Sequence, residues 1–170
     1  MSVVLFYHGN RVSVMASDSR CNSEGGGFTD SIRKTFSIHG GLLGVVGDAG
    51  TITDVRRTLW EEPEVAKVSK WPKGEYVALY MDKTGKLFEI DGGQIIPHDE
   101  VTVIGVGVGG DVALGAAEAW LRMKRIRRRD NLTEKQVEQM LRFSLQCAIA
   151  HNSQCGGRIM LKVCDLRELA

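Results

Sequence analysis

The order of strand-like and helix-like segments constrains the fold more than any other feature of this sequence. Short apolar segments come in two blocks, at residues 3–46 and 76–106, and helical periodicity follows each block. A last strand-like segment, at 158–164, follows the second helical region. Strands grouped in blocks favour sheets covered by helices, whereas a doubly wound parallel sheet requires strict alternation of strand and helix. The order therefore predicts an α+β fold with two sheets.

Each block contains apolar runs separated by short turns that contain glycine. The run at 3–8 (VVLFYH) is almost continuously apolar, which is typical of a strand buried on both faces. The strands predicted in the first block are 3–8, 11–17, 35–39 and 42–46, with hairpin turns at Gly9-Asn10 and Gly40-Gly41. Those of the second block are 76–82, 86–90 and 101–106. The run Glu24–Gly27 predicts a flexible loop.

Three helices are predicted from apolar periodicity and from capping residues. The first follows an N-cap at Asp48 and ends near Pro63, and the second begins at Asp111. The third opens with a capping box at Thr133–Gln136 and is stopped by Gly156-Gly157. The three expected buried stripes are Ile52, Val55 and Leu59; Ala113, Ala116, Ala117, Trp120 and Met123; and Val137, Met140, Leu141, Ser144, Leu145 and Ala148.

Charge and composition exclude several classes of function. With 22 basic and 21 acidic side chains, the formal net charge is +1, so we expect no nonspecific binding to nucleic acid. The basic stretch at 124–129 is interpreted as a helix C-terminus with cations matched to the helix dipole. No apolar run approaches the length of about 18 residues that a membrane span needs.

Cysteine and histidine usage predicts neither disulfides nor a metal site. The four cysteines and four histidines, which show no metal-ligand spacing, are Cys21, Cys147, Cys155, Cys164, His8, His39, His98 and His151. Free thiols, together with an N-terminus that lacks the pattern of a secretory signal, predict a protein of the reducing cytoplasm. We expect it to need no metal and no organic cofactor.

Ser2, directly after Met1, is a candidate nucleophile. Removal of Met1 would leave a serine that carries both a free α-amine and a hydroxyl. An α-amine titrates at about 7.7–8.0, so near neutral pH it can accept a proton from its own hydroxyl, directly or through a water molecule. Many cytoplasmic proteins begin with Met-Ser, so this feature does not by itself indicate an enzyme.

Three further residues turn Ser2 into part of a candidate catalytic group. Asp18 ends the hairpin that Ser2 begins, and the outer ends of a hairpin lie together. Lys34 would lower the pKa of the amine and stabilise an alkoxide, with Asp18 keeping it charged. Gly47, at a turn from strand to helix, can present its backbone N–H to an oxyanion. Each has an ordinary structural explanation, but together they supply nucleophile, base, electrostatic support and oxyanion donor.

These residues and four longer motifs resemble the β-type subunits of proteasomes and, more closely, the bacterial HslV peptidase, which are N-terminal nucleophile hydrolases. The family's spacings of 16 from nucleophile to acid and 32 from nucleophile to lysine are matched by Ser2, Asp18 and Lys34. The similar segments are MASDSR (15–20), GVVGDAG (44–50), GVGVGGDVALGAAEAWL (105–121) and HNSQCGG (151–157).

The resemblance, which covers nearly the whole chain, implies a single domain over 1–170 with a four-layer αββα sandwich. It implies an endopeptidase of the threonine type, here with serine, that hydrolyses peptides or unfolded proteins. It also implies a homo-oligomeric ring, in which an ATP-dependent unfoldase is a candidate partner. In this sequence Val108 replaces the family's serine, Asn152 matches HslV, and Cys155 stands where proteasomes often have another serine.

Two alternative interpretations follow from particular features of the sequence. Val108, and a short segment where the family has a second long helix, favour a catalytically weak or inactive subunit that serves assembly. Separately, the glycines of 105–110 follow a strand and open a helix, as in a dinucleotide-binding motif. That motif needs a second parallel strand with an acidic residue, whereas another helix is predicted here, so we reject it.

Overall fold

The computed structural model describes residues 2–22 and 28–166. The predicted removal of Met1 and the predicted loop Glu24–Gly27 fall outside these residues. The helices are α1 (Ala49–Glu61), α2 (Gly110–Met123) and α3 (Glu134–His151), with 3₁₀ turns at Val65–Lys67 and Arg129–Asn131. The strands are β1 (Val4–His8), β2 (Val12–Ser17), β3 (Cys21–Asn22), β4 (Phe28–Thr29), β5 (Thr35–Ile38), β6 (Gly41–Val46), β7 (Val77–Met81), β8 (Leu87–Asp91), β9 (Gln94–His98), β10 (Val103–Val106) and β11 (Met160–Asp165).

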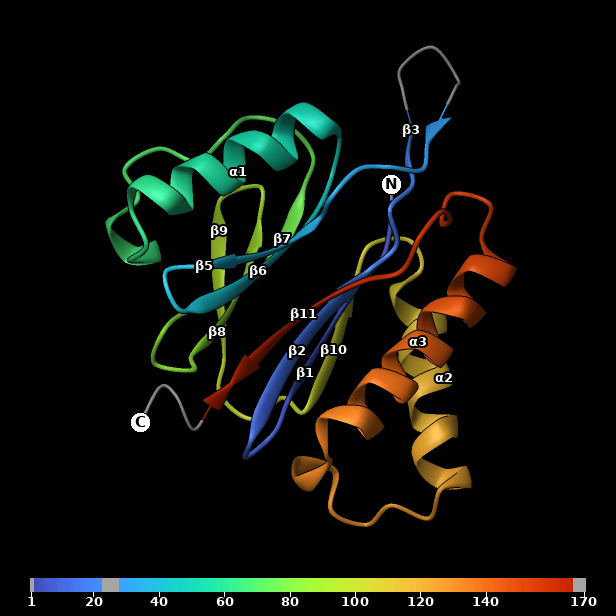
Figure 1. Cartoon of the computed structure of the whole chain (residues 1–170). Helices are drawn as coiled ribbons and strands as arrows, with labels where there is room; N and C mark the ends of the chain where they lie inside the picture. The colour runs from blue at the N-terminus through green and yellow to red at the C-terminus, as the bar shows by residue number, and fades with distance from the viewer. Residues whose placement is uncertain (1, 23–27, 167–170) are drawn as a thin grey trace.

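Two antiparallel sheets form the centre of the molecule (Figure 1). The first has the order β10-β1-β2-β11 and the second the order β5-β6-β7-β8-β9, while β3 and β4 form a separate short ribbon. Strand β10 runs antiparallel to β1, and α2 leads to α3 rather than to a parallel strand. This topology agrees with rejecting a dinucleotide-binding unit.

Three hydrophobic cores show that the chain has four layers. One core lies between the first sheet and the pair α2 and α3, and a second lies between the other sheet and α1. The third lies between the two sheets and contains Val4, Phe6, Leu42 and Leu79. The layers visible in Figure 1 are therefore helices, sheet, sheet, helix, which confirms the predicted αββα arrangement.

Strand β1 explains why the sequence begins with a continuous apolar run. Leu5 and Tyr7 pack toward α2 and α3, while Val4 and Phe6 pack against the opposite sheet. Since successive side chains of a strand point to opposite faces, a strand between two cores needs apolar residues at every position.

The N-caps predicted at Asp48 and Thr133 are confirmed, whereas one predicted helix end and one predicted buried residue are wrong. Helix α3 ends at His151, with Asn152 as its C-cap, and not at Gly156-Gly157. The Asp48 side chain accepts a hydrogen bond from the Thr51 N–H at 2.9 Å, and Thr133 and Gln136 form the capping box. The whole predicted stripe of α3 is buried. Met123, however, is 64% exposed, because α2 ends at this residue, beyond its contact with the core.

Strand β9 is absent from the sequence-based prediction. It contains Pro97, and all five of its residues are exposed or half-buried, because it is an edge strand paired only with β8. Edge strands need no apolar alternation, which leaves little signal in the sequence. Among the described residues, no helix combines the length and hydropathy required to cross a bilayer.

Candidate active site

The β1–β2 hairpin places Ser2 beside Asp18. Val4 pairs with Ser17, so the residues just before Val4 and just after Ser17 meet at the end of the sheet. There the Val3 N–H donates to Asp18 Oδ1 at 3.2 Å, and the Asp18 N–H donates to the Val3 carbonyl at 3.3 Å. The antiparallel register alone thus fixes the Asp18 carboxylate one residue from Ser2.

Lys34 reaches the same point from the other sheet, where it immediately precedes β5. Its Nζ donates to the Ser2 hydroxyl, to Asp18 Oδ1 at 2.7 Å and to the Arg20 carbonyl. The Ser2 hydroxyl in turn donates to the Arg20 carbonyl at 2.9 Å. Ser2, Asp18 and Lys34 are all fully buried. The three donors of one ammonium group therefore join the candidate nucleophile, an acid and a backbone carbonyl.

Burial dominates the electrostatics of this cluster. Desolvation lowers the pKa of Lys34 below its ordinary value, and the Asp18 charge opposes that shift. The Asp18 carboxylate is held by two backbone donors as well as by the lysine, since Oδ2 accepts from the Gly156 N–H at 2.9 Å. A buried ion pair persists only when its remaining polar atoms are satisfied in this way.

Gly47 lies between β6 and α1, in the turn that the sequence predicted. A Cβ at this position would lie 3.2 Å from Tyr76 Cβ and 3.3 Å from the Glu75 carbonyl oxygen, so a larger residue would push these segments apart. Its carbonyl accepts a weak hydrogen bond from the Cys21 thiol at 3.9 Å. Within the described part of the chain, no hydrogen bond uses the Gly47 N–H. This donor is therefore available to a ligand.

Gly107 brings this turn close to the nucleophile. It has a φ of +89°, and a Cβ there would overlap the Ser2 carbonyl oxygen and lie 3.1 Å from Val46 Cγ1. Only glycine combines that backbone conformation with so close an approach. Val46, the residue before Gly47, therefore lies next to the main chain of Ser2.

The residues expected around the nucleophile lie near it without touching its hydroxyl. Asn152, the C-cap of α3, donates from Nδ2 to the Val108 carbonyl at 3.1 Å and so ties the end of α3 to the turn before α2. Cys155 is buried, and its sulfur would meet a Cβ placed on Gly109. Burial raises the pKa of the Cys155 thiol to about 11, and the Asp18 charge adds to the shift. This thiol is consequently protonated near neutral pH.

Sequence reasoning missed Arg20, Gly107 and Gly156. Arg20 supplies the carbonyl that both Ser2 and Lys34 use, and Gly156 supplies an N–H to Asp18. These contacts are made by backbone atoms, which no side-chain motif reveals. Of the three, only Gly107 could have been suspected from the sequence, because it lies within the glycine-rich run at 105–110, where a positive φ is expected.

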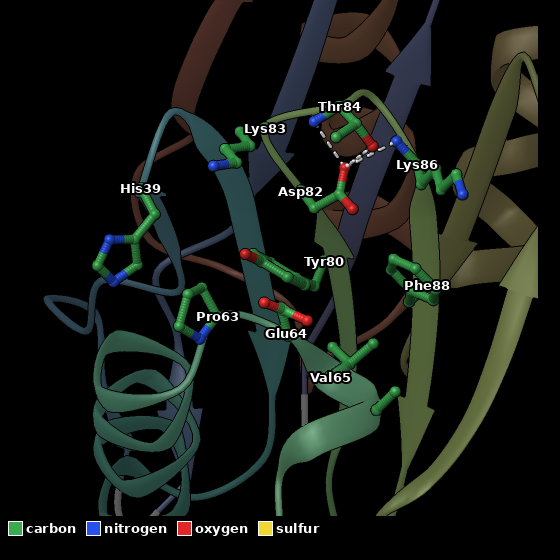
Figure 2. A pocket seen from close by; sticks show the side chains of 11 residues that line it. His39, Pro63, Glu64, Val65, Tyr80, Asp82, Lys83, Thr84, Lys86 and Phe88 are labelled. Atoms are coloured by element: carbon green, nitrogen blue, oxygen red, sulfur yellow. Dashed lines mark hydrogen bonds between the residues drawn. The ribbon is translucent and has the colours of Figure 1, made fainter.

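A prominent cavity of the molecule lies away from this cluster. It has a volume of about 570 Å³ and is lined by residues from the β5–β6 turn, the segment after α1 and the β7–β8 hairpin. Figure 2 shows Tyr80 and Phe88 in it, beside the turn at 82–86. None of its lining residues belongs to the Ser2 cluster, so volume alone does not indicate where chemistry occurs. In the described residues, no three His, Cys, Asp or Glu side chains gather as a metal site would require.

Comparison with known proteins supplies structural neighbours only. No protein-family model and no curated protein matches the sequence. HslV from Trypanosoma brucei superposes with a TM-score of 0.71 and 16% identity, over 96% of this chain and 99% of that one. BPH from Thiobacillus denitrificans, in complex with epoxomicin, superposes with a TM-score of 0.70 and 13% identity, over 96% of this chain and 98% of that one.

A third neighbour has a longer chain. Anbu, described as an ancestral beta-subunit, from Yersinia bercovieri gives a TM-score of 0.69 and 16% identity, over 99% of this chain and 83% of that one. At such identities the likeness establishes architecture and not activity. The chain has the HslV-like fold of the N-terminal nucleophile hydrolases.

Proposed function

We propose that this chain is a peptidase of the N-terminal nucleophile type, whose nucleophile is Ser2 after removal of Met1. The observation that carries the proposal is the buried Lys34 ammonium, which joins the Ser2 hydroxyl to the Asp18 carboxylate. Burying a charged lysine together with its carboxylate partner costs free energy of desolvation. The hydrogen bond between this lysine and the Ser2 hydroxyl therefore favours a chemical role for the cluster.

The proposed reaction uses the two functional groups of Ser2. The α-amine takes the hydroxyl proton, and Oγ attacks the carbonyl carbon of the scissile peptide bond. Lys34, held charged by Asp18, stabilises the developing negative charge, and the Gly47 N–H donates to the oxyanion. The C–N bond then breaks as the leaving amine takes the proton, and water hydrolyses the acyl ester to restore Ser2.

The same proposal includes the substrates, the location and the assembly of the protein. We expect one functional domain over 1–170 that acts on peptides or unfolded proteins in the cytoplasm. An exposed peptidase site would be hazardous there, so we expect a homo-oligomeric ring that encloses it, and an ATP-dependent unfoldase as a candidate partner. The HslV-like fold supports a ring.

The experiment combines intact mass with covalent labelling. BPH has been seen in complex with epoxomicin, an epoxyketone, and such reagents need both a hydroxyl and a free α-amine. Wild-type protein should lack the mass of Met1 and gain one epoxomicin per chain, and Ser2→Thr should also react. Ser2→Ala should neither react nor hydrolyse a fluorogenic peptide, while Ser37→Ala, at an exposed serine of β5, should match wild type. Full turnover by Ser2→Ala would overturn the proposal.

A second function, assembly without catalysis, is favoured by two observations. Val108 presents an apolar side chain where the family has a hydroxyl, and its carbonyl is occupied by Asn152. Between α1 and β7, only a short 3₁₀ turn at Val65–Lys67 stands in place of a second long helix. In this case the purified chain would retain Met1 and oligomerise, and epoxomicin would leave its mass unchanged.

A further inference from the structure

We propose that the Arg20 side chain is a clamp that positions Ser2, Asp18 and Lys34, by fastening the loop at 153–156 and the segment at Asp30 around them. The inference rests on the proposed function and deepens it. Arg20 does not touch the reacting atoms with its guanidinium group, so it is a positioning residue and not a catalytic one.

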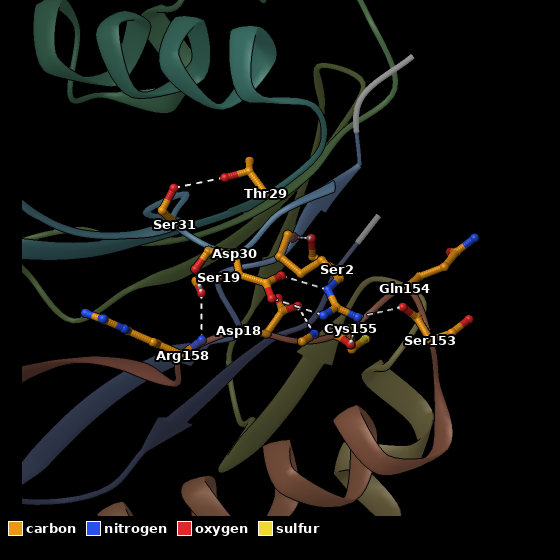
Figure 3. Close-up of polar contacts among 12 residues, drawn as sticks. Ser2, Asp18, Ser19, Thr29, Asp30, Ser31, Ser153, Gln154, Cys155 and Arg158 are labelled. Carbon is orange, nitrogen blue, oxygen red and sulfur yellow. Dashed lines mark hydrogen bonds and ion pairs between the residues drawn. The ribbon is translucent and has the colours of Figure 1, made fainter. Parts of the chain in front are cut away.

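The guanidinium group donates hydrogen bonds to both of these segments. Nε donates to Asp30 Oδ1 at 2.8 Å and one terminal nitrogen donates to Oδ2 at 3.1 Å, so the pair is bidentate. The other terminal nitrogen donates to the carbonyls of Ser153 at 3.1 Å and Cys155 at 3.3 Å. The three residues that accept these bonds, Asp30, Ser153 and Cys155, are labelled in Figure 3.

The main chain of Arg20 connects the clamp to the candidate nucleophile. Its carbonyl accepts hydrogen bonds from Ser2 and Lys34, and its N–H donates to the Gly156 carbonyl at 3.1 Å. Gly156 in turn donates its own N–H to Asp18 Oδ2. A displacement of the loop would therefore move a donor of Asp18 and the acceptor of Lys34 together.

The guanidinium group lies against Gly156 at very close range. A Cβ on Gly156 would overlap the Arg20 Cζ, and the distance to the terminal nitrogen would be 2.7 Å. The absence of a side chain at 156 thus permits the planar group to lie on the loop backbone while it bonds to both segments. This close contact is an observation independent of the hydrogen bonds.

Ser19 makes a second connection between the same parts of the chain. Its hydroxyl donates to the Asp30 carbonyl at 2.5 Å and accepts from the Arg158 N–H at 2.7 Å (Figure 3). Two consecutive residues after Asp18 therefore tie together the segment before β5 and the loop after α3. That loop needs such ties because it leaves α3 at Asn152 without regular structure before β11.

Arginine suits this task because of its shape more than its charge. The Arg20 and Asp30 side chains are 20% and 40% exposed, so their attraction is screened by solvent. A lysine would keep the charge but could not present the planar fork to a carboxylate and two carbonyls at once. The substitution Arg20→Lys thus separates geometry from charge.

The ionisation of Lys34 supplies a readout for the clamp. The groups facing Lys34 are the Ser2 hydroxyl, the Asp18 carboxylate and the thiols of Cys21 and Cys155. The charges of Arg20 and Asp30 lie beyond them. Since burial lowers the Lys34 pKa, a loop that opens and admits water should raise it toward its ordinary value.

The main test compares Arg20→Lys and Asp30→Asn with wild type. We expect each to lower kcat/KM for a fluorogenic peptide by about tenfold or more, mostly through kcat, because a displacement of roughly 1 Å near reacting groups has effects of that order. In Arg20→Lys the basic limb of the pH profile, where Lys34 loses its proton, should move to higher pH. The double variant should be no slower than Arg20→Lys alone, because both changes break one connection.

The matched controls are Arg142→Lys and Glu138→Gln. These residues form an exposed pair on α3, 2.9 Å apart and each 46% exposed, and both variants should stay within about twofold of wild type. Any of three results would refute the clamp. These are wild-type rates in Arg20→Lys and Asp30→Asn, additive effects in the double variant, and a pH profile that Arg20→Lys does not shift.

A separate measurement distinguishes failure of the clamp from failure of the proposed function. If wild type shows neither turnover nor epoxomicin labelling, the peptidase proposal fails. NMR titration of the Lys34 side chain then decides the clamp, because Arg20→Lys should still raise its pKa. An identical Lys34 titration in wild type and Arg20→Lys would overturn the inference whatever the activity.

Discussion

The buried pair of Lys34 and Asp18 yields the sharpest prediction for stability. Asp18→Asn removes the only carboxylate within hydrogen-bond distance of the Lys34 ammonium in the described part of the chain and leaves a fully buried cation without its partner. An asparagine whose oxygen takes the place of Oδ1 still accepts from the Val3 N–H and from Lys34 Nζ, but its N–H₂ group then faces the Gly156 N–H. The substitution therefore breaks charge pairing and also creates a contact between donors.

The expected magnitude follows from the burial of both partners. Removal of one member of a buried ion pair destabilises a protein by about 3–5 kcal/mol, whereas an exposed pair contributes about 0–1 kcal/mol. Both side chains here have 0% exposure, so the larger range applies. Lys34→Met in the Asp18→Asn background should recover much of the loss, because the uncompensated cation is then absent.

The loss should depend on pH in a defined direction. The Lys34 pKa is already lowered below 10.5 in the folded state, so the unfolded chain binds more protons between the two values and wild-type stability rises with pH there. Without the Asp18 charge, which opposes the shift, the folded pKa falls further and the rise begins at lower pH. The deficit of Asp18→Asn relative to wild type therefore shrinks as pH increases.

Urea unfolding of wild type, Asp18→Asn and the double variant at about pH 7 and about pH 9 measures these free energies. Glu138→Gln, from the exposed pair on α3, serves as the control and should change the free energy of unfolding by less than about 1 kcal/mol. A deficit for Asp18→Asn below about 1 kcal/mol at both pH values, or one that grows with pH, would refute the reasoning.

Three further predictions concern other parts of the site. Gly107→Ala should destabilise the protein by about 1–3 kcal/mol in urea unfolding and slow epoxomicin labelling, because its φ is +89° and its Cβ would overlap the Ser2 carbonyl; equal stability would contradict that contact. Tyr76→Phe should leave stability unchanged or raise it by up to about 1 kcal/mol, because the buried hydroxyl has no partner among the described residues. With its pKa raised to about 11, Cys155 should react with iodoacetamide at least about tenfold more slowly near pH 8 than the half-buried Cys147, as peptide mass spectrometry would show.

Much of the architecture could be predicted because it depends on local patterns. The apolar run at 3–8 indicated a strand buried on both faces, and the six-residue stripe of α3 indicated the face that packs on the first sheet. The caps at Asp48 and Thr133 determine where two helices begin. Predictions failed where local patterns carry little information, at Met123 in the last turn of α2 and at the exposed edge strand β9.

The sequence by itself determined the residue types of the candidate site and their spacing, with Ser2, Asp18 and Lys34 at the ends of predicted strands. Only the tertiary structure decided that Lys34 is fully buried and that Arg20 and Gly156 complete its surroundings. The physical reason is that these contacts use backbone atoms, and that the contact between Asp18 and Gly156 joins residues 138 positions apart in the chain. Backbone donors and acceptors are the same for every residue, so their use is decided by packing and not by the sequence pattern.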